Sequence, residues 1–268
     1  MAKERFGSER LKWSADGFDL LCTDEQWGGF PFRFEFSCTN PVMRADGRGE
    51  VDSRNLLVVA LAYKPWHIIA LIDGPTTVTA NGMIEPLHHG RITASIQIQG
   101  EDNVTVSVEM PRLSSDRFGS WSQALGHIRS RLGGGYDVAA KIQGGELKTG
   151  RFEVLPIDEA SLLGSVDTAS RVKVDTISLK HGDVDYWGSG SMELDQEGRP
   201  SGTISTETNN LTGLINLVEP HLGLSPQQNS NLELILGMLG KTAKIDVIAR
   251  NGELYVGPFK IGDLKPLY

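Results

Sequence analysis

Hydrophobic and polar residues alternate with a period of two over most of residues 18–113. The clearest case is GGFPFRFEFSC at residues 28–38, where four phenylalanines and a cysteine occupy every second position. Side chains two apart on a strand share a face. The pattern therefore predicts one β-strand whose apolar face, including Phe30, Phe34 and Cys38, packs against a substantial apolar surface.

Two further patterns predict β-hairpins. Residues 92–98 and 104–110 alternate on either side of the turn-like GEDN, which places Ile96 and Val106 on an apolar face. The opposite face is rich in Ser, Thr and Gln, as is typical of an antiparallel sheet with one face in water. Near the end of the chain, Asn251-Gly252 is a strong signal for a two-residue hairpin turn.

Residues 118–132 do not follow the period-two alternation. Apolar residues that include Trp121 and Leu125 follow an i, i+4, i+7 spacing, and three glycines at 133–135 follow them. This spacing predicts an amphipathic helix that ends at the glycines. Residues 156–170 fit either a short helix or a loop.

Two more helices are predicted near the end of the chain. Residues 211–222 and 229–239 each carry an apolar stripe, and the second stripe includes Leu236 and Leu239. The predicted fold class is therefore mainly β with a few helices (α+β), in which long curved antiparallel sheets have an apolar face covered by amphipathic helices.

The length of 268 residues fits one large β domain or two ordinary ones. The 31 glycines favour strands and turns, and we find no internal repeat. We expect a single β-rich domain over residues 15–268, with a subdivision near residues 133–135. Residues 1–14 are interpreted as a linker close to a membrane.

Charge and hydropathy exclude several classes of function. A net charge of −8 without a Lys/Arg cluster argues against nucleic-acid binding, because phosphate contacts require clustered cations. The same charge disfavours electrostatic docking on anionic lipid, whereas neutral lipid ligands stay open. Apolar runs are too short to cross a bilayer as a helix.

The two cysteines, Cys22 and Cys38, each end an apolar stretch and are separated by the turn-like TDEQWGG. A hairpin would bring them close enough for a disulfide, and the alternative is a pair of buried free thiols. A disulfide implies an oxidising compartment. Because residues 1–13 have no apolar region typical of a signal peptide, we expect a targeting or anchor segment to be missing from this sequence.

Motifs of catalysis are not found. The sequence contains no G-x-S-x-G elbow, H-E-x-x-H motif or phosphate-binding G-x-x-x-x-G-K-[ST] loop. His181, Asp183 and Asp185 would share a face of an extended strand and would then offer three metal ligands, but HGD also fits a solvated turn. We expect no enzyme activity, no cofactor and no metal site.

Three stretches resemble a family of uncharacterised alphaproteobacterial proteins: ADGFDLLC at 15–22, GGFPFRFEFSCTNP at 28–41 and NGELYVGPFKIGDLKPL at 251–267. The resemblance implies a periplasmic β-rich domain behind one N-terminal transmembrane anchor, similar in style to AsmA-like envelope proteins. Some of those proteins are implicated in lipid movement. The resemblance also aligns Cys22 and Cys38, and it implies no catalytic residues.

The sequence thus predicts a periplasmic module, tethered to the inner membrane, that binds a lipid or another hydrophobic molecule in an apolar cleft. The alternative is a structural envelope protein whose sheet edges bind partner proteins. The residues predicted to form the apolar wall or core are Phe30, Phe34, Ile96, Val106, Trp121, Leu125, Leu236 and Leu239.

Overall fold

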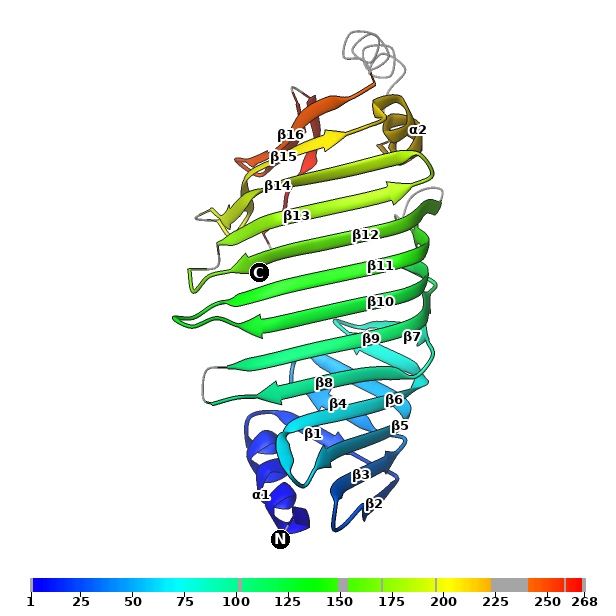
Figure 1. Cartoon of the computed structure of the whole chain (residues 1–268), viewed down its shortest axis with the longest axis vertical. Coiled ribbons are helices and arrows are strands. Elements are labelled where there is room, and N and C mark those ends of the chain that lie inside the picture. The colour runs from blue at the N-terminus through cyan, green and yellow to red at the C-terminus, as the bar shows by residue number, and fades with distance from the viewer. Residues whose placement is uncertain are drawn as a thin grey trace. The chain divides into compact units, whose positions relative to one another are not determined.

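The protein is mostly antiparallel β-strand, with two short helices among the residues described (Figure 1). The structure, a computed structural model, describes residues 2–100, 103–148, 154–169, 171–195, 197–222, 241–257 and 259–266. No helix in these ranges is long and apolar enough to span a membrane. The chain divides into two compact units, unit 1 (Met1–His127) and unit 2 (Ile128–Tyr268).

Unit 1 is built from helix α1 and strands that pair only in the antiparallel direction. Its elements are α1 (Ala2–Ala15), β1 (Phe18–Leu21), β2 (Asp24–Gly28), β3 (Arg33–Thr39), β4 (Val42–Ala45), β5 (Gly49–Leu61), β6 (Lys64–Ala80), β7 (Met83–His88), β8 (Ile92–Ile98), β9 (Val104–Ser115) and most of β10 (Gly119–Ser130). The pairings form two runs of strands, β2-β3-β5-β6-β8-β9 and β1-β4-β5-β6-β7-β9.

Strands β5 and β6 belong to both runs because their pairing is interrupted midway. Their register shifts between Ser53 and Asn55, and such bulges let one strand turn from one sheet into another. A buried polar network lies at this corner: the Ser53 and Thr76 hydroxyls are 2.7 Å apart, and His89 Nε2 lies 2.8 Å from Thr76 Oγ1. Gly74 is required here, because a Cβ at this position would lie 2.8 Å from the His89 ring.

The core of unit 1 lies between the two runs. Phe36, Cys38 and Leu56 are buried and form its centre, and the partly buried Trp27 packs against them. The rings of Trp27 and Phe36 are 4.9 Å apart between centroids and inclined by 51°, a favourable tilted arrangement. The disulfide between Cys22 and Cys38 links the end of β1 to β3, which confirms the predicted pairing.

Unit 2 is an antiparallel meander in which each strand pairs with the next one along the chain (Figure 1). Its elements after β10 are β11 (Tyr136–Lys148), β12 (Val154–Val166), β13 (Val172–His181), β14 (Val184–Leu194), β15 (Pro200–Thr208), α2 (Leu211–Leu222), β16 (Ala243–Arg250), β17 (Glu253–Val256) and β18 (Phe259–Asp263).

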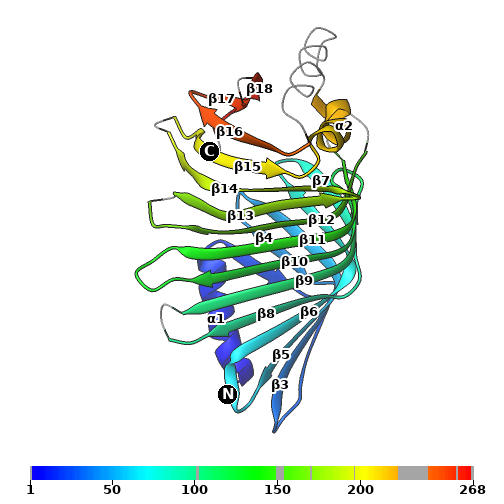
Figure 2. The same cartoon turned by 45° about the horizontal axis from the view of Figure 1, so that its top comes forward.

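Helix α2 confirms the helix predicted at 211–222 and packs on β14 (Figure 2). It begins after Asn210, whose Oδ1 accepts a hydrogen bond of 2.9 Å from the Gly213 backbone N–H. Asparagine favours this position because it satisfies one of the free N–H groups of the first turn. Leu211, the first helical residue, is almost completely buried. The second predicted helix, 229–239, lies outside the described residues.

Three predictions about local structure are wrong. Residues 156–170, expected to form a short helix or a loop, lie largely in β12. Residues 118–132 form β10 rather than a helix, because the pairing of β10 with β9 overrides a helical spacing of apolar residues. Phe30 and Phe32 do not pack on the apolar face. The strand begins only at Arg33, so both rings lie in the turn before it and are exposed.

Two loops of unit 2 have the same pattern of hydrogen bonds. In each, an aspartate accepts backbone hydrogen bonds from the loop and pairs with an arginine four residues later. The pairs are Asp167 with Arg171, between β12 and β13, and Asp195 with Arg199, between β14 and β15. Backbone hydrogen bonds, first of all from these arginines, lower the pKa of both carboxyls.

We expect acid to destabilise the protein partly through these loops. A carboxyl whose pKa is lowered by folding contributes stability above its unfolded pKa, near 3.9, and loses it as the pH falls through the folded value. Asp167→Asn/Asp195→Asn should be less stable than wild type at neutral pH and should lose less stability on acidification below about pH 4. Urea midpoints measured on both sides of that pH test this, and parallel losses in the two proteins would contradict it.

Candidate functional site

Unit 2 has one continuous apolar face. Residues opposite each other in antiparallel strands point to the same side of a sheet. Ala140 pairs with Leu162, which pairs with Ile177, and the row continues through Gly188 and Thr206. The neighbouring rows have the same character. The apolar face consists of Val138, Ala140, Ile142, Ala160, Leu162, Val174, Ile177, Leu179, Tyr186, Ile204, Ile245, Val247 and Val256.

The opposite face of the same strands carries most of their charged side chains, together with the apolar Ile157, Leu163 and Trp187. Lys141 Nζ lies 2.8 Å from Glu159 Oε2, and Lys244 Nζ lies 2.5 Å from Glu207 Oε1. The hydrogen bond from Lys141 lowers the pKa of Glu159, and the one to Glu207 raises the pKa of Lys244. The sheet therefore has one face suited to water and one suited to apolar contacts.

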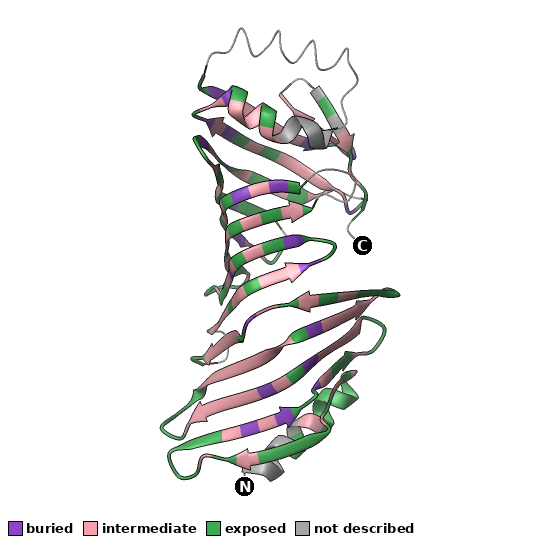
Figure 3. Ribbon diagram, turned by 90° about the vertical axis from the view of Figure 1, so that its right-hand side faces the viewer, coloured by how far each residue is buried: buried purple, intermediate pink, exposed green. Residues whose placement is uncertain are grey.

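The apolar face is only partly covered. Thr208 and Ala243, which continue this face, are buried, and so is Leu211 of α2, but the described helices do not show the predicted covering of the whole face. Over β12 it is open, and Leu162 keeps 37% of its surface exposed. Most residues of these strands are intermediate or exposed rather than buried (Figure 3). An apolar surface that is partly covered and partly open can accept a hydrophobic ligand.

Tyr186 is a polar residue on this apolar face, which also carries Thr206 and Thr208. Burial raises the pKa of its phenol, and a hydrogen bond to Thr206 acts in the opposite direction. The phenol is therefore neutral over the physiological range and offers a hydrogen-bonding group beside apolar side chains. An amphiphilic ligand with a polar head could be oriented by it.

Unit 1 carries an apolar row of its own, which brings together three residues predicted for the wall or core. Phe34 pairs with Ala60, Ala60 with Ile68, Ile68 with Ile96 and Ile96 with Val106. Phe34 is partly exposed, whereas the other four side chains are half-buried.

The other predicted wall residues lie elsewhere. Gln123 donates 2.8 Å to Glu109, and His127 Nδ1 lies 2.8 Å from Ser107 Oγ, so these residues share the polar face of β9. Trp121 is two residues from Gln123 and six from His127 in the same strand. Its side chain therefore lies on the same side of the sheet as theirs, away from Val106.

Leu125 is four residues after Trp121 in β10, so it shares the polar face with Trp121. Phe30 lies in the β2–β3 turn. Leu236 and Leu239 lie outside the described residues. The six predicted wall residues that the structure describes therefore do not form one surface.

The sequence did not reveal the apolar face of unit 2. The alternation in residues 171–182 was a usable signal for β13, but the adjacent Leu162 and Leu163 obscure the period of β12. These two leucines lie on opposite faces.

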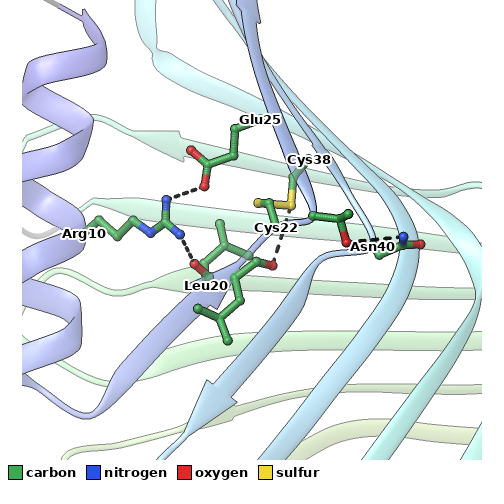
Figure 4. Close-up of a disulfide and its surroundings, with 8 residues drawn as sticks. Arg10, Leu20, Cys22, Glu25, Cys38 and Asn40 are labelled. Carbon is green, nitrogen blue, oxygen red and sulfur yellow. Dashed lines mark hydrogen bonds and ion pairs between the residues drawn. A yellow bond between two sulfur atoms is a disulfide. The ribbon is translucent and has the colours of Figure 1, made fainter.

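Around the disulfide, α1 is tied to the neighbouring strands (Figure 4). The Arg10 guanidinium lies 2.5 Å from the Glu25 carboxylate and also donates to the Leu20 carbonyl oxygen. Asn40 Nδ2 donates to Thr23 Oγ1 at 3.4 Å. These contacts and the Cys22–Cys38 bond fix the start of the sheet rather than form a reactive site.

No cluster of metal-ligating side chains is found in the part of the chain that the structure describes. Asp183 accepts a hydrogen bond of 2.9 Å from Asn210, and Asp185 lies 3.5 Å from Lys180. A pocket of about 190 Å³ on the polar side of unit 1 includes the Asp73–Arg91 ion pair. It is smaller than the usual ligand pocket of roughly 300–1,000 Å³.

Comparison with known proteins places the chain in one family. The model of the family described as "uncharacterized protein conserved in bacteria" (DUF2125) matches residues 12–265, and the chain belongs to this family. Neither the curated proteins nor the solved structures contain a match.

Proposed function

We propose that this protein binds a lipid or a similar hydrophobic molecule in the cell envelope, without a cofactor. The observation that carries the proposal is the apolar face of unit 2, which crosses the meander opposite a charged face and is still open at Leu162. A globular protein normally buries such a face, because exposed apolar area is unfavourable in water. An acyl chain lying across the strands would cover it.

The disulfide supports the cellular location in this proposal. Disulfides persist in oxidising compartments such as the bacterial periplasm, and Cys22 and Cys38 are bonded. The disulfide supports a periplasmic location. A tether to the inner membrane, where acyl chains are abundant, is a further part of the proposal. In this proposal α2 covers one end of the apolar face and the ligand occupies the rest.

Two adjacent leucines give a matched test. Leu162 and Leu163 are 37% and 50% exposed on opposite faces of β12. Leu162→Glu should lower the affinity for a fluorescent long-chain fatty acid by about tenfold or more, because a carboxylate beside an acyl chain loses its hydration. Leu163→Glu should leave that affinity within about twofold of wild type, because its carboxylate stays in water. Equal effects of the two variants would contradict a site on this face.

Mass spectrometry distinguishes this proposal from a scaffold. Native spectra of the purified protein, followed by organic extraction, should reveal a bound lipid-like mass. A protein that is free of ligand, takes up no added fatty acid and retains protein partners would instead support a structural role through sheet edges. The edge strand β2 (Asp24–Gly28) would then be the first place to look, because β3 is its one partner in the described sheet.

A further inference from the structure

The ends of two neighbouring hairpins in unit 1 expose aromatic rings. Phe30 and Phe32 lie between β2 and β3 and are 84% and 79% exposed. Tyr63, in the β5–β6 turn, and Trp66, near the start of β6, are 68% and 49% exposed. These four residues are called the aromatic tips. Such exposure of large rings is costly in water and marks interaction surfaces when the rings are adjacent.

The backbone holds the two turns together. Arg33 pairs with Leu61 in the last rung between β3 and β5, and the Ala62 N–H donates to the Phe32 carbonyl oxygen at 3.0 Å. Phe30, Phe32 and Tyr63 lie in the turns beyond this rung, and Trp66 lies in β6 next to the His67–Gln97 rung with β8. The tips are therefore a projecting edge rather than a cleft, and none of the four residues lines the pocket described above.

The chemistry of the tips matches a lipid surface. Tryptophan, tyrosine and phenylalanine combine an apolar ring with, in the first two, a polar group, and such residues concentrate where membranes meet water. Residues 29–34 and 61–66 contain the cations Arg33 and Lys64 and no carboxylate, although the chain has a net charge of −8. Long cationic side chains reach lipid phosphates while their stems stay in apolar surroundings.

We propose that the aromatic tips dock the protein on a phospholipid bilayer. Arg33 also lies 2.7 Å from Glu35, so its charge is partly balanced and insertion of the rings, rather than attraction of charge, provides most of the binding. Docking would hold unit 1 against the membrane independently of any anchor. It does not depend on ligand binding by unit 2, and the two proposals are tested by separate measurements.

Flotation with phosphatidylcholine vesicles tests the docking, because these vesicles have no net charge. Wild type should float with the vesicles and should still do so at high salt, which screens exposed charges. Phe30→Ser/Phe32→Ser should lower the bound fraction at limiting lipid by about tenfold, because each serine removes an inserting ring. Tyr63→Ser/Trp66→Ser should act in the same direction.

Met83→Ser/Ile84→Ser is the matched control. Both side chains are exposed on another hairpin of unit 1, between β6 and β7, so their loss removes apolar area without touching the tips. This control should bind like wild type. All variants alter exposed side chains and should keep the wild-type unfolding midpoint, which separates lost docking from lost folding.

The depth of Trp66 in the bilayer can be measured independently on the intact protein. Brominated phosphatidylcholine should quench the fluorescence of Trp66, and the quenching should fall in Trp66→Phe. The proposal is overturned if wild type does not float, or if the serine variants float as well as wild type. It is equally overturned if the variants lose only self-association, since the tips would then bind a second copy.

Discussion

Replacing Phe36 with alanine should destabilise the protein by about 3–5 kcal/mol, the usual cost of removing a buried phenylalanine ring. Phe36 is 4% exposed, packs on Trp27 and lies opposite Val58 in the register of β3 and β5. Its removal leaves a cavity that the surrounding strands cannot fill, because their backbones are fixed by pairing on both sides.

Phe32→Ala is the matched control for this experiment. It removes the same ring from a position four residues earlier that is largely exposed, so we expect a change within about 0.5 kcal/mol. Urea unfolding followed by circular dichroism and tryptophan fluorescence measures both variants. Similar losses would mean that Phe32 is packed as the period-two pattern alone predicts.

The regular alternation of the N-terminal half was enough to predict paired strands. The predicted hairpin at residues 92–110 is formed by β8 and β9, with Ile96 opposite Val106. The turn at Asn251-Gly252 is also confirmed, since both residues have positive φ and Arg250 pairs with Glu253. These features depend on residues close together in the sequence, so the local pattern contains the information that determines them.

Local patterns could not determine which strands, distant in the sequence, pair with each other. In β10 a helical spacing of apolar residues competes with strand pairing, and contacts with β9 decide in favour of the strand. Residues 156–170 similarly fall largely within β12, because pairing with β11 and β13 stabilises an extended conformation. Phe30 shows the same limitation at a strand end, where the last paired rung decides which rings are covered.

The candidate site depends even more on register. The apolar face of unit 2 exists because seven consecutive strands, β11 to β17, place apolar residues opposite one another. A shift of one residue would move each of them to the other side of the sheet. No single strand reveals this face. The disulfide could be predicted because its two cysteines flank one short turn region.

Removing the disulfide should cost about 3 kcal/mol, because the bond closes a loop with a sequence separation of 16 and so restricts the unfolded chain. Comparison of oxidised with reduced wild type isolates the crosslink, since both sulfur atoms remain in place. Cys22→Ala/Cys38→Ala should be slightly less stable than the reduced protein, because Cys38 is buried beside Phe36 and its sulfur also contributes packing.

These two comparisons relate the stability of the protein to the redox state of the compartment in which it folds. A loss of about 3 kcal/mol is a large part of the stability of an ordinary domain, so the protein should unfold more readily where thiols are kept reduced. Protein isolated from the periplasm should therefore show a mass two daltons below the reduced chain. Reduced protein that unfolds at the same urea concentration as the oxidised form would show that the buried contacts of Cys38 suffice without the bond, and the argument for an oxidising compartment would lose its energetic basis.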